Sequence, residues 1–479
     1  MSNPDPTVTN LSLTLGSLGT YNATVTTWEM VADVTMAAQG FTFPTGRWLV
    51  TLVIAGFPAD KAPVSVVSQQ DITLGSPGTI TVPAETFYHL RDFTQARSVQ
   101  VQLTVSKRSG SLWVPFASTG ANNGIVALPA AAAGTVPPFG AASEQVFGPL
   151  TNFQNYPIGY LQGAHAAIKA AGGTITRNDT QWMQLCPTSA AFDATIQAAY
   201  DAYFTSCATN GLKAIVYLCP IISSPAWAAT SGVRGNPPAS WSDYSTFVSN
   251  FLARWGTNIA AVAMINEPNL YGSIPNGTAA LDAPTYVGLL QHTYSAVKAA
   301  SPTMPVLAGS LSLCDTTYLA SLYAQAGFKG NYDAIDIHPY SVDFFQTPPI
   351  AHDPSIAQSA ANAMVDILPG LMAVHKMMRD NSEGTVPIWV VECGWNAGVS
   401  GAGKTYNAYD VSEAQQAAFT AYALRALARL GYVNVANFYA ARDTSPNAYL
   451  SPNSWGWSDY WGNRQKPVVA ALAAAKAAP

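Results

Sequence analysis

From about residue 144 onward, short apolar runs alternate with longer helical segments, and this alternation most constrains the fold of the chain. Each run is rich in apolar and β-branched residues, as expected of a strand covered on both faces. Strands that alternate with helices are typical of a parallel sheet with helical crossovers. The eight predicted strands are Gln145–Leu150, Thr174–Asn178, Lys213–Cys219, Ile259–Ile265, Val306–Ser310, Ala334–His338, Ile388–Val391 and Val435–Tyr439.

Eight strands, each followed by a helix, predict an α/β chain with a (β/α)8 TIM barrel. The predicted helices include residues 161–171, 190–210, 244–255, 283–300 and 412–430. Asn210-Gly211 and Leu430-Gly431 have the glycine that commonly ends a helix. A doubly wound open sheet is the alternative. No G-x-G-x-x-G motif follows an early strand, so nothing in the sequence favours a dinucleotide-binding fold.

The first 117 residues have a different pattern, with short alternating segments separated by glycine and proline. Val99–Val105 is the clearest, because its apolar side chains fall on one face and its polar ones on the other. Several such strands predict an N-terminal antiparallel β-sandwich over residues 1–117. Residues 118–143, rich in alanine, glycine and proline, are predicted to be a linker, and residues 144–479 the barrel.

Composition excludes several classes of function. Of the 479 residues, 49% are hydrophobic and 10% are charged, which fits a large packed core. The net charge is −5 and no basic run occurs, so nucleic acid is not an expected partner. No apolar stretch of about 18 residues predicts a membrane span. The N-terminus has no basic segment followed by an apolar one, so no signal peptide is visible.

The five cysteines are scattered through the second half of the chain, and none forms a C-x-x-C pair. An odd, scattered set argues against a disulfide framework and against a zinc cluster. Cys393 follows a glutamate, and the neighbouring negative charge discourages a thiolate, so a nucleophilic role for it is not expected.

Two glutamates stand in equivalent settings at the ends of predicted strands. Glu267 follows the run Ile259–Ile265 within Asn266-Glu267-Pro268, and Glu392 directly follows Ile388–Val391. In a barrel, the carboxyl ends of all the strands meet at one face, where active sites are found. Two carboxylates in such a place are the groups that cleave a glycosidic bond. The sequence therefore predicts a pair of catalytic carboxylates at the mouth of the barrel.

On these residues, the segment from about 145 to 475 resembles clan A glycoside hydrolases. It is most similar to family 39 and to related bacterial exopolysaccharide hydrolases. The resemblance implies that Glu267, after strand four, is the acid/base and that Glu392, after strand seven, is the nucleophile. It also implies that Asn266 binds the 2-hydroxyl of the sugar. No metal or organic cofactor is expected.

Further positions extend the resemblance. Arg177, near the end of strand two, matches an arginine that lies beside the nucleophile. His338 and Tyr340, at the end of strand six, match site residues of the clan, and Trp227 lies in a segment similar to one with a substrate-facing tryptophan. Strand eight departs from the pattern, because Tyr439 stands where many members have tryptophan.

Aromatic residues are concentrated near the predicted mouth, and flat apolar rings stack on sugars. Trp395 follows the predicted nucleophile, and Trp457 lies in an aromatic segment after strand eight. The predicted substrate-binding residues are therefore Asn266, Arg177, His338, Tyr340, Trp227, Trp395, Tyr439 and Trp457.

The sequence thus predicts a retaining glycoside hydrolase, endo-acting on a bacterial envelope or matrix polysaccharide. An alternative is a virion tail or adhesin component that binds envelope glycan, with or without depolymerase activity. Transglycosylation, β-xylosidase and α-iduronidase activities are less favoured readings. An extracellular or virion-associated location is expected, with the N-terminal region as an attachment, carbohydrate-binding or assembly module.

Overall fold

The computed structural model divides the chain into two compact units, residues 1–133 with 355–362 and residues 134–354 with 363–479. In the first unit it describes only the strands. In the second it describes residues 135–142 and 158–477, apart from residues 222, 233–234, 271–279, 341, 344–349, 352–366, 399–409, 444–453 and 460–461. In this part of the chain no helix is long and apolar enough to cross a membrane.

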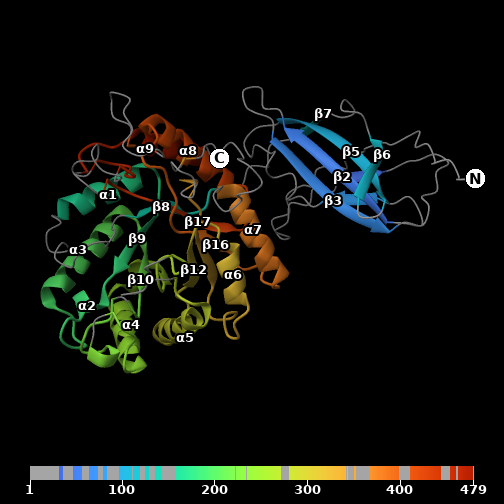
Figure 1. The fold of residues 1–479 in the computed structure, drawn as a ribbon. Helices are drawn as coiled ribbons and strands as arrows, with labels where there is room; N and C mark the ends of the chain where they lie inside the picture. Colours follow the sequence, from blue (N-terminus) through green and yellow to red (C-terminus); the bar gives the residue numbers. More distant parts are fainter. Residues whose placement is uncertain are drawn as a thin grey trace, which may run out of the picture. The chain divides into compact units, whose positions relative to one another are not determined.

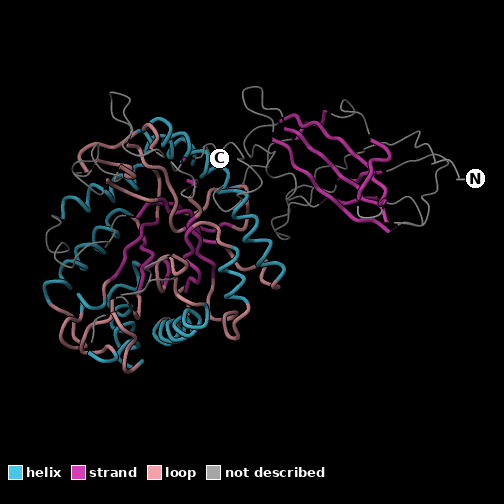
Figure 2. The backbone as a smooth tube through the Cα atoms, in the orientation of Figure 1, coloured by secondary structure: helices cyan, strands magenta, loops and turns pink. Residues whose placement is uncertain are grey.

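Eight parallel strands of the second unit close into a barrel. Each strand pairs with the next along the chain, and the last pairs with the first. Figures 1 and 2 show these strands at the centre of the unit, inside a layer of helices. The prediction of a (β/α)8 barrel is confirmed and the open sheet is excluded. The strands are β8 (Phe139–Ala142), β9 (Ile175–Thr180), β10 (Lys213–Leu218), β11 (Ile259–Ala263), β12 (Val306–Ser312), β13 (Ala334–His338), β16 (Ile388–Val390) and β17 (Val433–Phe438).

The helices follow the strands in alternation, and the five predicted from the sequence are present. They are α1 (Ile158–Ala170), α2 (Trp182–Leu185), α3 (Ala194–Asn210), α4 (Trp241–Trp255), α5 (Ala283–Ala300), α6 (Thr316–Tyr323), α7 (Ile367–Asp380), α8 (Glu413–Ala428) and α9 (Pro467–Ala477). Short elements complete the unit: the 3-10 helices η3 (Thr230–Gly232) and η4 (Gly256–Asn258), and a hairpin of β14 (Val342–Asp343) and β15 (Ile350–Ala351).

Local signals explain where the helices begin and end. The Asp193 carboxylate accepts the backbone N–H groups of Thr195 and Ile196, so α3 starts with a side-chain cap. Gly211 ends α3 in the left-handed conformation with a φ of 70°. Ser412 and Gln415 form a capping box at the start of α8.

The first barrel strand differs from the prediction. It is β8 at Phe139–Ala142, where all four residues are buried, and not Gln145–Leu150, which lies outside the described residues. β8 therefore falls inside the segment predicted to be a linker. The physical reason is its sequence, Phe-Gly-Ala-Ala, whose small residues fit between neighbouring strands but give a weak hydrophobic signal. Gly140 illustrates the fit, because an added Cβ would collide with the backbone of Ile175.

The barrel interior is filled by an apolar cluster. Tyr217 is one of its buried members and links this packing to the polar site above it. The others are Ile175, Ile215, Ala261, Ala263, Leu307, Ala334, Val391 and Val435. Side chains that fill the interior leave no pore, so chemistry is confined to the ends of the strands.

The first unit contains antiparallel sheets. One has the order β3-β2-β5-β6, with β7 also paired to β5, and another joins β1 to β4. Expected strands at residues 7–9 and 22–28 lie outside the described residues, and the sandwich itself stays a prediction. β7 lies in the segment expected to be a linker. The strands are β1 (Ala32–Thr35), β2 (Arg47–Gly56), β3 (Val64–Thr73), β4 (Thr79–Val82), β5 (Arg97–Ser109), β6 (Leu112–Ser118) and β7 (Ile125–Leu128).

Candidate active site

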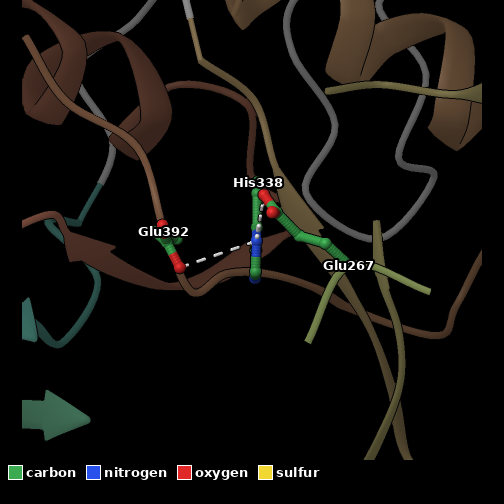
Figure 3. Close-up of side chains that lie close together, drawn as sticks. All are labelled: Glu267, His338 and Glu392. Atoms are coloured by element: carbon green, nitrogen blue, oxygen red, sulfur yellow. Dashed lines mark hydrogen bonds and ion pairs between the residues drawn. The ribbon is translucent and has the colours of Figure 1, made fainter. Parts of the chain in front are cut away.

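The two predicted catalytic glutamates lie together at the carboxyl end of the barrel. Glu267 follows β11 by four residues and Glu392 follows β16 by two. One oxygen of each carboxylate and a ring nitrogen of His338 all lie within 4.8 Å of one another. Figure 3 shows His338 between the two carboxylates, with contacts to both. Residues 125 positions apart in the sequence therefore form one cluster.

Glu392 is buried, and both of its oxygens are engaged. The Tyr340 hydroxyl donates to Oε1 at 2.5 Å, and Nη1 of Arg177 donates to Oε2. Only 6% of the Glu392 surface is exposed. Hydrogen bonds from a phenol and a guanidinium hold both oxygens of this carboxylate and fix its orientation.

Arg177 connects several residues of the site. It donates to both oxygens of Asp179, at 2.9 and 3.2 Å, and to Oδ1 of Asn266 at 2.7 Å. Its guanidinium also lies 4.1 Å above the ring of Tyr217. Burial alone lowers the pKa of Arg177, but Asp179, Tyr217 and Glu392 together raise it well above its ordinary value. Arg177 is thus a permanent cation beneath the carboxylate pair.

Glu267 is more exposed than Glu392, with 17% of its side chain accessible. Its backbone has a φ of 45°, in the left-handed region that a glutamate seldom adopts. The conformation is held by a hydrogen bond from its N–H to the Ser310 carbonyl at 2.9 Å. Such strain costs on the order of 1 kcal/mol and persists only where neighbouring structure enforces it.

A bulge in β12 provides that neighbouring structure. The register between β12 and β13 shifts between Gly309 and Leu311. Gly309 and Ser310 both have positive φ angles, of 98° and 50°. An added Cβ on Gly309 would lie 2.7 Å from the Asp336 carbonyl oxygen, so glycine is required there.

His338 is fully buried and contacts both glutamates. Its Nδ1 lies 3.2 Å from Oε1 of Glu267 and 3.7 Å from Oε2 of Glu392. Burial opposes a charge on the ring, but Asp336 and then Glu392 favour it, and the pKa of His338 rises to about 10. His338 is therefore an imidazolium cation near neutral pH.

The distances within this cluster would also suit a metal ion, but its chemistry does not. Arg177 and Tyr340 already engage both oxygens of Glu392. A protonated His338 has no free ring lone pair to offer a metal. We therefore do not assign Glu267, His338 and Glu392 as metal ligands.

Tyr439 lies at the end of strand eight, next to the site. It follows β17 and is partly buried. It packs beside Leu313, Tyr340 and Trp455, with its ring centroid 5.8 Å from that of Trp455. This aromatic group forms one wall next to Glu392 and leaves part of Tyr439 accessible to a ligand.

Trp395 and Trp457 do not face the substrate as expected. Each is 1% exposed. Trp395 packs edge-on against Phe419 of α8, and Trp457 packs against Phe438. A ring without an exposed face cannot stack on a sugar, so these two predictions are wrong, and both residues are packing residues.

Trp227 is partly buried, and its recorded contacts are structural. Its indole N–H donates to the Cys186 carbonyl at 2.7 Å, and its ring meets Trp182 edge-on. A role for Trp227 in substrate binding stays a prediction. Cys393 is buried, and burial and the nearby Glu392 raise its thiol pKa well above the ordinary value, in line with the expected absence of a nucleophilic role.

Sequence reasoning missed Asp336, Tyr217 and Ser310, which lie directly beneath the site. The Tyr217 hydroxyl donates to Oδ2 of Asp336 at 2.8 Å, and the Ser310 hydroxyl donates to the same oxygen at 2.5 Å. One signal for Asp336 was available. It precedes His338 by two residues in an otherwise apolar strand, so both side chains point to the same face.

Comparisons with known proteins support the fold. No protein-family model and no curated protein matches the chain. Among solved structures, the chain is similar to a family 39 glycoside hydrolase from the gut symbiont Bacteroides cellulosilyticus WH2, at 16% identity and a TM-score of 0.51 over 91% of this chain and 78% of that one.

Two further structures have similar scores, both at 16% identity over 72% of this chain. One is a GH5_18 protein from Bifidobacterium longum subsp. infantis, with a TM-score of 0.52 and 79% of its length covered. The other is a GH39 β-xylosidase from Caulobacter crescentus, with a TM-score of 0.50 and 73% covered. These structural neighbours belong to the clan that the sequence resembles. At this identity the similarity establishes the shared barrel fold.

Proposed function

We propose that the protein is a retaining O-glycosyl hydrolase in which Glu392 is the nucleophile and Glu267 the acid/base. The observation that carries the proposal is the spacing of the two carboxylates, whose facing oxygens lie within 4.8 Å. Retaining enzymes place their carboxyl groups about 5–5.5 Å apart, whereas inverting enzymes need about 6.5–9.5 Å to admit a water molecule. The close pair at the mouth of a barrel favours retention.

In the first step, an oxygen of Glu392 attacks the anomeric carbon while Glu267 gives its proton to the departing glycosidic oxygen. Arg177 and Tyr340 suit the nucleophile, because both donate to Glu392 and orient it. Asn266 directly precedes Glu267 and accepts a hydrogen bond from Arg177 at 2.7 Å, and its role would be to bind the sugar 2-hydroxyl. The product of this step is a glycosyl ester of Glu392.

In the second step, Glu267 takes a proton from a water molecule, whose oxygen attacks the anomeric carbon and releases Glu392. The greater exposure of Glu267 fits this role, because the acid/base must meet both the leaving group and the incoming water. Two displacements at one carbon restore the original stereochemistry. An acceptor sugar in place of water would give transglycosylation.

We further propose a neutral sugar at the cleaved position, within a bacterial envelope or matrix polysaccharide cut internally. In the described part of the mouth, the cations Arg177 and His338 are each neutralised by carboxylates. No spare cation is therefore offered by these residues to a uronate. The resemblance to exopolysaccharide hydrolases supports the polymeric substrate. An extracellular or virion-associated location and an attachment role for the first unit accompany this proposal.

Release of reducing ends from a panel of bacterial envelope, matrix and plant polysaccharides tests the activity. Glu392→Gln is expected to abolish release, and Glu413→Gln, at a partly buried glutamate paired with Arg464, serves as the matched control. Product length on the active polymer separates internal cleavage from terminal release. If wild type and Glu392→Gln release nothing and retain one glycan equally well, the adhesin function replaces the enzyme.

Azide rescue on an activated aryl glycoside assigns the two roles. With Glu392→Ala, azide is expected to attack the anomeric carbon directly and give the inverted glycosyl azide. With Glu267→Ala, the ester still forms from the good leaving group, and azide then gives the retained product. The opposite assignment of products would reverse the roles of the two glutamates.

A further inference from the structure

Asp336 is a buried carboxylate directly behind the site, and the proposed reaction does not use it. It lies in β13, two residues before His338, and is fully buried. Its Oδ2 accepts hydrogen bonds from Tyr217 at 2.8 Å and from Ser310 at 2.5 Å. Its Oδ1 has no hydrogen-bond partner among the described residues and lies 3.6 Å from Nε2 of His338.

This arrangement fits an ionised Asp336 opposite a charged ring. A carboxylate only accepts, and both hydroxyl groups can donate to it. A buried carboxylate with one unsatisfied oxygen needs a nearby cation, and His338 faces that oxygen. An imidazolium has N–H groups on both sides, so one points toward Asp336 and the other toward the glutamates.

We propose that Asp336 is a positioning residue that keeps His338 doubly protonated, with Nδ1–H directed at the Glu267–Glu392 pair. The inference rests on the proposed function and deepens it, by assigning a fixed positive charge between the two reacting carboxylates. Asp336 acts only through His338, because Tyr217, Ser310 and the ring itself enclose it.

A fixed positive charge on His338 would be useful in both displacement steps of the proposed reaction. In the free enzyme Glu392 is ionised and Glu267 is protonated, and in the glycosyl ester Glu267 is ionised and Glu392 is neutral. One negative charge therefore moves between the two residues. Nδ1 of His338 lies 3.2 Å from one and 3.7 Å from the other, so a single imidazolium is within reach of the charge in both states.

The bulge in β12 connects Asp336 to the backbone of Glu267, the proposed acid/base. The Ser310 hydroxyl donates to Asp336, while the Ser310 carbonyl accepts the backbone N–H of Glu267 at 2.9 Å. The residue that fixes the backbone of Glu267 is thus also a partner of the carboxylate behind His338. Shifting one of these contacts would shift the other.

The groups around His338 come from four elements. They are Asp336 on its own strand, the Tyr217 hydroxyl of β10 at 3.3 Å from Nε2, Glu267 after β11, and Glu392 after β16. Arg177 is a like charge that shares Glu392 with His338, and it is paired with Asp179 and Glu392. Burial lowers the pKa of His338, whereas Asp336, as the largest opposing influence, and Glu392 raise it to about 10.

Nitrogen-15 NMR of histidine side chains tests the link without any substrate. The chain has six histidines, and the signal lost in His338→Gln identifies the residue. In the wild type, both ring nitrogens of His338 are expected to stay protonated through pH 8. In Asp336→Asn, the pKa of the ring is expected to lie below 7, a fall of at least about three pH units from the wild-type value of about 10. The matched control is Asp333→Asn, at the exposed residue just before the same strand, which should leave His338 unchanged.

A wild-type His338 that titrates near its ordinary value, or an Asp336→Asn variant in which it stays protonated, would overturn the proposal. If Asp336→Asn does not fold, Asp336→Ser also removes the charge behind His338, and the titration of His338 is expected to fall in the same direction. An unchanged titration in Asp336→Ser would then count against the proposal.

The pH profile of activity tests the consequence for the reaction. If His338 is neutral, a positive charge beside the two carboxylates is lost and they bind protons more readily. Both the acidic and the basic side of the bell-shaped kcat/KM profile should therefore move to higher pH by about 1–3 units in Asp336→Asn. A folded Asp336→Asn with the NMR change but an unmoved bell would remove the role of Asp336 in the reaction. If no glycoside is cleaved by the wild type, the proposed function fails, while the NMR titration still decides the Asp336–His338 link.

Discussion

Replacing Arg177 by methionine isolates the contribution of the cation beneath the two carboxylates. Methionine has a similar length and apolar stem but no charge and no donor. The substitution removes two hydrogen bonds to Asp179, one to Asn266 and one to Glu392, together with the contact over the Tyr217 ring. It leaves Asp179 and Glu392 buried without their main counter-charge.

The structure sets the size of the effect. Removing one partner of a buried ion pair costs about 3–5 kcal/mol, because the other charge stays buried and unpaired. His338 lies 3.7 Å from Glu392 and compensates in part, so we expect the lower half of that range, about 3–4 kcal/mol. The deficit should shrink toward pH 4, because protonation of the carboxylates removes the unpaired charge.

Urea unfolding followed by tryptophan fluorescence gives this number for the barrel, since nine of the 12 tryptophans lie after residue 180. The matched control is Arg254→Met. Arg254 also makes a two-bonded ion pair, with Asp201, but on the surface, and solvent screening should make its loss far less costly.

Equal losses for Arg177→Met and Arg254→Met, or a deficit for Arg177→Met that does not change with pH, would refute the reasoning. The first result would mean that burial does not amplify the interaction. The second would mean that the loss comes from packing around the Arg177 stem and not from unpaired charge.

The remaining predictions concern the β12 bulge and a buried histidine. Gly309→Ala should lower the free energy of unfolding by about 2–4 kcal/mol, because its Cβ would meet the Asp336 carbonyl oxygen at 2.7 Å. Gly211 also has a positive φ but no atom close to an added Cβ, so Gly211→Ala should cost only about 1 kcal/mol in the same urea titration. Burial lowers the pKa of His165 from 6.5 to about 4, so the unfolded chain binds this proton first and stability falls as pH drops from about 6.5 to about 4, by about 3 kcal/mol in total. Unfolding of His165→Gln across that range should lack this part of the pH dependence.

The barrel was predictable because its strands are buried on both faces. Short buried runs such as Ala334–His338 stand out against the helical segments around them, and this strand begins and ends where predicted. β8 was missed because close packing there requires glycine and alanine, which give no hydrophobic signal. The sequence thus predicts a strand where large side chains fill the barrel, and fails to predict one where small side chains let neighbouring strands pack closely.

Most of the predicted site residues that the structure brings together end or follow a strand. Glu267, Glu392 and Tyr340 follow strands, and His338 ends one. The number of aromatic residues near the mouth does not predict that Trp395 is buried, because an indole ring can stack on a sugar or pack against a helix. The hydrogen bond between Ser310 and Asp336 depends on a bulge in β12, and no local sequence pattern predicts the register shift that the bulge causes.

The short strand β8 has a consequence for any shortened form of the protein. It pairs with β9 on one side and with β17 on the other, so it alone joins the two ends of the sheet. A chain that begins at residue 134 keeps the ring of backbone hydrogen bonds complete. One that begins at residue 144 exposes two open sheet edges, which attract strands from other molecules and favour aggregation.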